Sequence, residues 1–586
     1  MVKARHFWFG KSVSGDSDCA GFMITDNAGS FANIGSVPES KYQGFFINNG
    51  GRVFRVIESL ELKGAVRELR NRFYAVERVR TSIAEKFFLP HHYDSLSYRL
   101  SKGSEFDVVL DCMEAYDMRR FGRYYSIHEK SGVIVVEFVK KTDYREDGSN
   151  DTEEFRMYLA IKTNGSFERL GEWVRREYQL DRSRNTSYER YVYRALRLNA
   201  SKTVFAASFN ESSAISHADY VFDNQGSLEN EQKAHCNHFS SPTLALYAAE
   251  TALHSLITKT GIYAGLPWFF QHWCRDSLVA APAAGRMLWK RIVLSHLSMI
   301  GNEGRLPNVD GSGVGSGLGS SDAVGWLFLR AGQLYSENAF TKDEVRKITS
   351  VLGKSLQLQQ KHYGRDNLVF SKRNESWMDT SYNDNGREGF PIEVQALTLA
   401  AYSFLWLLTK SGKAKERELA MAKKVRQKFW NGSYLNDLAD DSTVRPNVFI
   451  AAYAYPQLLS KKEWEKCIDN VLPRLWLDWG GLSSIDKSHP LFQPNYTGED
   501  NRSYHRGDSW FWVNNLAAIV MARINKNKYR SYIERIKAAS VNDLLWKGAI
   551  GCCSELSSAS QQRAEGCLNQ AWSCSTLIEL LRQGQR

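Results

Sequence analysis

Four short segments of this chain place tryptophan within a few residues of a carboxylate, an arginine or a histidine. They are residues 265–278, 375–379, 504–512 and 570–573, and each lies at a loop beside an apolar run with helical period. Aromatic rings can cover the apolar faces of sugars, whereas carboxylates, guanidinium groups and amides bond the hydroxyl rims. The repeated pairing predicts an enzyme that acts on carbohydrate.

Hydrolysis of a glycosidic bond needs a proton donor for the leaving oxygen and a second carboxylate that activates water or attacks the sugar. Asp379 follows Trp377 by two residues. A tryptophan there could desolvate the acid and raise its pKa, as a proton donor requires. The same carboxylate could instead cap a turn before Thr380, and the local sequence favours neither role.

The second carboxylate has three candidates. Glu555 stands between a predicted helix and the loop that leads into the last predicted helix, where it could face the mouth of a helical ring. On its own it would be read as a surface glutamate. Asp508 and Glu499 are rivals because both lie in another aromatic loop. The residues alone leave this choice open.

Other polar residues stand where predicted helices begin. Arg275 and Asp276 could clamp two sugar hydroxyls with charge-assisted hydrogen bonds, or could simply complement the helix terminus. Asn308 and Asp322 are small polar residues at helix starts, for which capping is the default explanation. His505 could bond a hydroxyl or be a satisfied loop histidine.

Two kinds of structure are predicted to position these residues. Residues 1–235 contain short β-branched or alternating runs separated by turn residues, which predicts an antiparallel β-sandwich. Within this domain we expect a helical excursion at 165–195 and a surface linker at about 210–240. Residues 236–586 are predicted to form a helical domain of about twelve helices in sequential hairpins, closed as an α/α toroid with polar loops at one mouth.

The helical runs in the second domain follow from apolar residues that recur with helical period. They are 241–258, 276–299, 321–337, 342–362, 391–410, 414–430, 446–459, 461–473, 509–524, 526–545 and 570–583.

Composition argues against several classes of function. The net charge is +11, but basic and acidic residues are interleaved, which indicates a mixed solvated surface and no nucleic-acid partner. The nine cysteines are scattered and contain no CxxC pair, so we expect no disulfide framework, metal or cofactor. With no apolar leader and no run of about 20 apolar residues, we expect a cytoplasmic protein without a membrane partner.

At these residues the chain resembles the amylo-α-1,6-glucosidase family, the glucosidase part of glycogen debranching enzymes, in its short archaeal or bacterial form. The motifs follow one another in the family's order along nearly the whole chain. They are Leu266-Pro-Trp268-Phe269 with Arg275-Asp276, Gly304-Arg-Leu-Pro-Asn308, Ser321-Asp322, Trp377-Met-Asp379, Arg445-Pro-Asn447, Tyr504-His-Arg-Gly507 and Gln570-Ala-Trp-Ser573.

The resemblance implies a β-sandwich followed by an (α/α)6 barrel, similar to the barrel of inverting glucoamylases. It implies Asp379 as the general acid and Glu555, 17 residues before Trp572, as the base. The residues that it assigns to sugar binding are Trp268, Arg275, Asp276, Asn308, Asp322, Trp377, Arg387, Glu393, His505, Asp508 and Trp510.

The activity implied is the exo-acting, inverting release of glucose from α-1,6 branch points, with glycogen or a branched maltodextrin as substrate. Two alternatives remain, a glucoamylase-like α-1,4-glucosidase and a glycan-binding protein without activity. The chain departs from the family at Tyr504-His-Arg-Gly-Asp-Ser-Trp510, where Tyr-His-Gln-Gly-Thr-Val-Trp is usual. It also has Gly386-Arg-Glu-Gly389 in place of Pro-Arg-x-Gly.

Overall fold

The computed structural model describes residues 1–19, 21–142, 152–236, 241–311 and 319–583. The chain divides into two compact units. The first comprises Met1–Thr260 and Leu544–Cys552, and the second comprises Gly261–Asp543 and Cys553–Arg586. The boundary predicted between residues 235 and 236 falls within the first unit.

The first unit is built from strands that share one hydrogen-bonded network. They are β1 (Val2–Trp8), β2 (Lys11–Ser17), β3 (Phe22–Thr25), β4 (Phe31–Ile34), β5 (Gly44–Asn49), β6 (Arg52–Glu61), β7 (Val66–Asn71), β8 (Val76–Arg80), β9 (Ala84–Phe88), β10 (Ser95–Glu114), β11 (Arg123–Lys130), β12 (Val133–Lys141), β13 (Glu153–Thr163), β14 (Ser166–Glu177) and β15 (Glu189–Ser208).

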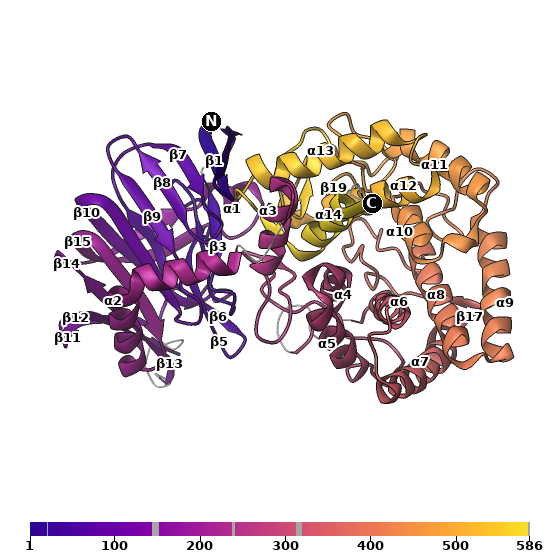
Figure 1. Ribbon diagram of the computed structural model, residues 1–586, viewed down its shortest axis with the longest axis horizontal. Coiled ribbons are helices and arrows are strands. Elements are labelled where there is room, and N and C mark those ends of the chain that lie inside the picture. Colours follow the sequence, from indigo (N-terminus) through magenta and orange to yellow (C-terminus); the bar gives the residue numbers. More distant parts are fainter. Residues whose placement is uncertain (20, 143–151, 237–240, 312–318, 584–586) are drawn as a thin grey trace. The chain divides into compact units, whose positions relative to one another are not determined.

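The long strands β10 and β15 lie at the centre of this network and pair antiparallel, with Ser95 opposite Ala206. The described strand pairs are antiparallel except β1 with β7, which is parallel. Alternate side chains such as Phe45, Phe87 and Phe205 point into one large apolar core. The layered strands appear on the left of Figure 1.

Two local predictions in this unit are wrong. The segment predicted as a surface linker is helix α2 (Glu211–Cys236), which packs Ala214, Ala218 and Val221 against the strands. The helical excursion predicted at 165–195 is mostly β14 and the start of β15, with only the short helix α1 (Gln179–Ser183) between them.

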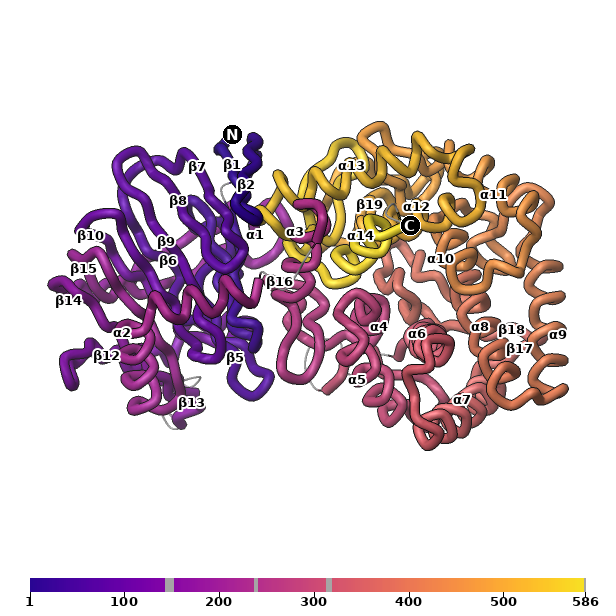
Figure 2. Tube along the Cα trace, in the orientation of Figure 1, coloured from indigo at the N-terminus to yellow at the C-terminus, as the bar shows by residue number. Residues whose placement is uncertain are grey.

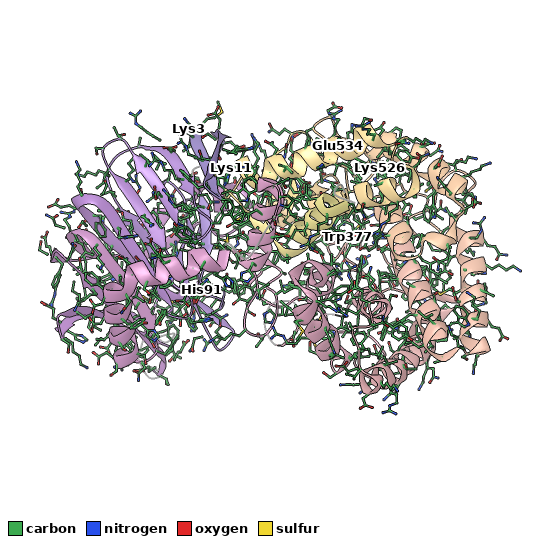
Figure 3. The ribbon with its side chains drawn as sticks, in the orientation of Figure 1. Lys3, Lys11, His91, Trp377, Lys526 and Glu534 are labelled. Carbon is green, nitrogen blue, oxygen red and sulfur yellow. The ribbon has the colours of Figure 1, made fainter. Side chains whose placement is uncertain are left out.

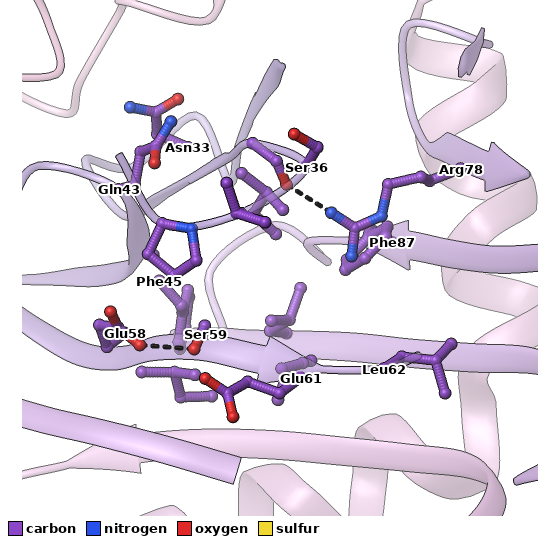
Figure 4. Close-up of a pocket in the computed structure, with 18 of the residues that line it drawn as sticks. Asn33, Ser36, Gln43, Phe45, Glu58, Ser59, Glu61, Leu62, Arg78 and Phe87 are labelled. Carbon is purple, nitrogen blue, oxygen red and sulfur yellow. Dashed lines mark hydrogen bonds between the residues drawn. The ribbon is translucent and has the colours of Figure 1, made fainter. Parts of the chain in front are cut away.

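The first unit also contains a cavity of about 340 Å³, shown in Figure 4. Glu58, Arg78 and Phe87 are among the residues that line it. Arg78 donates from Nη1 to the Gly35 carbonyl at 2.5 Å, and its Nε bonds Glu85. All of the lining residues belong to the first unit, so this cavity is distinct from the helical site described below.

The helices at the end of the first unit and through the second match the predicted runs closely. They are α3 (Leu244–His254), α4 (Cys274–Ala280), α5 (Arg286–Leu297), α6 (Ala323–Ser336), α7 (Lys342–Tyr363), α8 (Ile392–Thr409), α9 (Gly412–Phe429), α10 (Asn447–Ala454), α11 (Lys461–Leu475), α12 (Phe511–Asn525), α13 (Arg530–Trp546) and α14 (Ala571–Gln583). The run predicted at 276–299 is divided into α4 and α5 by a 3-10 turn that contains Pro282.

Alternate helices of the second unit form a closed inner ring. Helices α4, α6, α8, α10, α12 and α14 each pack on the next, and α14 packs on α4. Helices α5, α7, α9 and α11 pack against members of this ring. Figure 1 and Figure 2 show this toroid on the right. The predicted toroid is confirmed.

Helix α8 is apolar because it belongs to the inner ring. Among the described helices, it alone is long and apolar enough to cross a membrane by length and composition, and 56% of it is buried inside the protein. Burial in the ring accounts for its composition.

Backbone bonds join the segments that lead into the inner helices. Short strands pair β16 (Gly265–Leu266) with β21 (Asn569–Gln570), and β19 (Ser509–Trp510) with β20 (Leu556–Ser557). The Ser321 N–H donates to the Glu375 carbonyl at 2.8 Å. These bonds collect residues that are far apart in the sequence at one end of the ring.

Candidate active site

The candidate residues lie in the segments that lead into the inner helices. Arg275 and Asp276 are in the first turn of α4, and Asp322 is the N-cap residue of α6. Asp379 precedes α8, and Glu555 precedes α14. The structure therefore brings both predicted catalytic carboxylates to the same end of the ring.

Asp379 is the more accessible of the two carboxylates, with 26% of its side chain exposed. Its loop is fixed by Trp377, labelled in Figure 3, whose indole N–H donates to Asn447 Oδ1 at 2.7 Å. Arg275 Nη1 lies 3.7 Å from Asp379 Oδ2, and His505 Nε2 lies 3.5 Å from Oδ1. A carboxyl group held in this way and open to solvent can deliver a proton to a glycosidic oxygen.

Glu555 is buried and held at both oxygens. The Tyr504 hydroxyl donates to Oε1 at 2.5 Å, and the Cys567 backbone N–H donates to Oε2 at 2.8 Å. Gly566 has a φ of +66°, and a Cβ at this position would lie 2.2 Å from Oε2. Donors that bond a carboxylate favour its charged form, which a general base needs.

Asp276 shares this environment with both candidate catalytic groups. Burial raises the pKa of Asp276 to about 7; Arg275 opposes the shift, and the charges of Glu555 and Asp379 add to it. Gln570 Nε2 donates to Asp276 Oδ1 at 3.0 Å. Asp276 therefore lies within electrostatic reach of both Glu555 and Asp379.

Arg275 is oriented by the residues at the start of α6. Its Nε donates to both oxygens of Asp322 at 2.9 Å, and its Nη2 donates to Ser320 Oγ at 3.2 Å. The remaining nitrogen, Nη1, is the one nearest Asp379. Asp322 therefore fixes the guanidinium in this structure, and direct sugar contact by Asp322 stays a prediction.

Arg387 and Glu393 form a buried ion pair that contacts the loop carrying Asp379. Arg387 donates to both oxygens of Glu393, at 2.8 and 3.1 Å, and to both oxygens of Asp437 at 2.9 Å. It also donates to Ser376 Oγ at 2.8 Å, three residues before Asp379. These contacts use all the donors of a guanidinium within the protein. Sugar binding by this pair stays a prediction.

The tryptophans of the site form a packed cluster. Trp377 is 1% exposed, and the rings of His505, Trp510 and Trp512 meet it edge to face. His505 stacks on Trp510 with centroids 5.0 Å apart. Burial lowers the pKa of His505 to about 4, with Asp379 opposing the shift, so the ring is neutral near pH 7. The aromatic cluster thus packs beside Asp379 through His505, and sugar binding by Trp377, His505 and Trp510 stays a prediction.

The remaining candidates also lie in buried surroundings. Asn308 is 4% exposed, and its Oδ1 has no hydrogen-bond partner among the described residues. Trp268 is buried beside β16. Asp508 is fully buried, and its Oδ2 accepts a bond from Ser503 Oγ at 2.7 Å. Burial raises the pKa of Asp508 well above its usual range.

Sequence reasoning gave no role to several residues that hold the site. Tyr504 lies in a recognised motif, but its partner Glu555 is 51 residues away in the chain. Asp437 lies in the segment before α10, just as the other carboxylates lie before their helices. This shared position is a sequence signal that could have identified Asp437 as a site residue. In the described part of the chain, no group of three or more His, Cys, Asp or Glu side chains is arranged to hold a metal ion.

Residues 228–579 match the amylo-α-1,6-glucosidase family. The chain belongs to this family. The matched region contains Asp379, Glu555 and the sugar-binding candidates. No curated protein matches the chain.

One solved glycoside hydrolase shares the fold, and a second aligns with part of the chain. A bacterial glucoamylase in complex with acarbose superimposes with a TM-score of 0.62 at 12% identity, covering 97% of this chain and 95% of that chain. A mannosylglycerate hydrolase from Thermus thermophilus has a TM-score of 0.43 at 15% identity, covering 58% of this chain and 100% of that chain. The glucoamylase confirms the predicted fold of this amylo-α-1,6-glucosidase family member, a β domain followed by an (α/α)6 barrel.

Proposed function

We propose that this protein is an exo-acting, inverting glycoside hydrolase that releases glucose from α-1,6 branch points of glycogen-type α-glucans. One observation carries the proposal: Asp379 and Glu555 lie at the same end of the ring and contact two adjacent residues, because the Tyr504 hydroxyl bonds Glu555 and His505 Nε2 lies 3.5 Å from Asp379. Membership of the amylo-α-1,6-glucosidase family supports the linkage. The acarbose bound to the structurally similar glucoamylase supports an α-glucan substrate.

In the proposed mechanism Asp379 protonates the glycosidic oxygen as the bond breaks. Glu555, held by Tyr504, removes a proton from a water molecule that attacks the opposite face of the sugar. Inversion at the anomeric carbon then gives β-glucose. Arg275 and Asp276 would bond the hydroxyls of the terminal glucose, because a guanidinium and a carboxylate can serve as donor and acceptor side by side.

The surroundings of the rival carboxylates favour Glu555 as the base. Asp508 is fully buried, and burial raises its pKa well above its usual range, which disfavours the charged form that a general base needs. Glu499 is exposed, on the 3-10 turn Gly498–Asp500. Glu555 is held by two fixed donors and acts electrostatically on Asp276.

We also propose a cytoplasmic location, because the nine cysteines are scattered along the sequence and do not have the spacing of a disulfide framework.

Linkage is tested by initial rates of glucose release from a singly glucosyl-branched dextrin and from maltotetraose. We expect the branched substrate to give the higher kcat/KM. A preference for maltotetraose would assign the chain to α-1,4 cleavage. If neither substrate releases glucose but both bind, the protein is a glycan-binding protein without activity.

A further inference from the structure

One six-residue turn contacts both candidate catalytic carboxylates. It runs from Ser503 to Asp508, between the 3-10 turn at Gly498–Asp500 and β19. Its ends are tied together, because the Asp508 N–H donates to the Ser503 carbonyl at 3.0 Å and Ser503 Oγ donates to Asp508 Oδ2 at 2.7 Å. Both end residues are fully buried. The turn is therefore a closed unit inside the protein.

The base is held by the second residue of the turn. Tyr504 bonds Glu555 Oε1 through its hydroxyl at 2.5 Å. The tyrosine ring is itself packed against His505 and Trp510, with centroids 4.8 and 4.7 Å away. The hydroxyl cannot shift without moving these rings, so it fixes the direction of one carboxylate oxygen.

The acid is held by the next two residues. His505 Nε2 lies 3.5 Å from Asp379 Oδ1. Arg506 Nη2 donates to the carbonyl of Thr380, the residue that follows Asp379, at 2.9 Å. The same nitrogen also bonds the Asn385 carbonyl. The guanidinium thus ties the loop that carries the acid to the turn.

The turn is anchored to its surroundings through its backbone. Arg445 Nη1 donates to the His505 carbonyl at 2.7 Å, and the Gly507 N–H donates to Ser484 Oγ at 2.9 Å. A Cβ on Gly507 would lie 1.7 Å from the Gln493 carbonyl oxygen, so no larger residue fits. These contacts hold the turn in a single position relative to the helical ring.

We infer that the turn Ser503–Asp508 sets the spacing between the acid and the base, with Tyr504 and Arg506 as its positioning residues. An inverting glycosidase keeps its two carboxyl groups roughly 6.5–9.5 Å apart so that water fits between sugar and base. A single rigid element that contacts both groups fixes that gap more closely than two independent loops would. The inference rests on the proposed function of Asp379 and Glu555.

The inference is tested with Tyr504→Phe in the full chain. The variant keeps the packed ring and removes only the hydroxyl that bonds Glu555. Tyr529→Phe is the matched control, because the Tyr529 hydroxyl also donates to a carboxylate, Asp469 Oδ1 at 3.0 Å, outside the segments that form the site. kcat, KM and the pH profile of kcat/KM are measured on whichever α-glucan the wild type cleaves faster.

For Tyr504→Phe we expect kcat to fall about 10- to 100-fold while KM changes little, since a misplaced base slows proton transfer but leaves the sugar contacts intact. The acidic limb of the profile should move to higher pH, because the charged carboxylate loses a donor. Arg506→Lys, which replaces the guanidinium whose Nη2 bonds the Thr380 and Asn385 carbonyls, should lower kcat and leave the acidic limb in place. Tyr529→Phe should match the wild type in both.

Each other result has a definite meaning. If the wild type releases glucose and Tyr504→Phe keeps its kcat and pH profile, the turn does not position the base, and the proposed function stands. Equal losses in Tyr504→Phe and Tyr529→Phe without a moved limb would reduce the turn to a stabilising element. A wild type that cleaves no α-glucan would remove the proposed function and this inference with it.

Discussion

Replacing Arg387 by methionine should strongly destabilise the helical unit. The change removes the buried guanidinium that bonds Glu393 and Asp437, both of which are 0% exposed in their side chains. Asp437 keeps two partners, Arg445 at 3.3 Å and Asn447 at 2.7 Å. Glu393 loses the Arg387 bonds to both of its oxygens. The loss of stability should therefore arise mainly from Glu393.

Breaking a buried ion pair from one side costs about 3–5 kcal/mol. At about 2 °C per kcal/mol for a unit of this size, the unfolding temperature should fall by about 6–10 °C. Arg346→Met is the control, since Arg346 and its partner Asp343 are 79% and 82% exposed and such pairs contribute about 0–1 kcal/mol. Differential scanning calorimetry measures both variants.

The loss should also depend on pH. Burial already raises the pKa of Glu393, against the opposing effect of Arg387, and removal of Arg387 raises it further. A carboxyl group whose folded pKa lies above its unfolded value destabilises the protein increasingly as pH rises. Arg387→Met should therefore lose more stability at pH 8 than at pH 5, and adding Glu393→Gln should recover part of the loss. A shift below about 2 °C, or a double variant that is no better than Arg387→Met, would refute this reasoning.

Three further predictions concern the site itself. Gly566→Ala should lower kcat by at least tenfold, because the added Cβ would collide with the Glu555 carboxylate. Gly432→Ala is the control, since Gly432 also has a positive φ but a Cβ there would meet no atom within 4 Å, and its kcat should stay at the wild-type value. Equal kcat values for the two variants would contradict a role for the contact between Gly566 and Glu555. Inhibition by glucose should strengthen from pH 6 to pH 8 as Asp276, with a pKa of about 7, becomes charged, and Asp276→Asn should remove this dependence. Asp379→Asn and Glu555→Gln should each reduce kcat by about 10²–10⁴-fold while calorimetry still detects binding of the branched dextrin. Near wild-type turnover in either variant would exclude that residue as acid or base.

The inner helices could be predicted from sequence because they carry strong signals. The run predicted at 391–410 is α8, whose apolar residues are buried in the ring. The sequence does not predict helix α2 because its buried face mixes small, apolar and polar residues, such as Ala214, Val221 and Gln225, within a polar segment. Strand β14 was read as helix because most of its residues are exposed, including Trp173 at 46%. Weak apolar periodicity gives no reliable choice between helix and strand.

A site residue could be predicted from sequence only where its immediate neighbours in the chain indicate its role. Asp379 lies beside a tryptophan in the sequence, so its local pattern carries information. The link between Tyr504 and Glu555 is made by folding, and no local pattern encodes it. The same holds for Arg387 and Asp437, which are 50 residues apart and meet only in the folded ring.

The anomer of the released glucose tests the assignment of Asp379 and Glu555 most directly. Wild-type protein is mixed with singly branched dextrin, and the first product is followed by proton NMR before mutarotation. An acid and a base on opposite faces of the sugar predict β-glucose as the initial product, with Asp379→Asn and Glu555→Gln silent in the same experiment. Initial α-glucose would mean that a carboxylate attacks the sugar directly, and would contradict Glu555 as a base that acts through water.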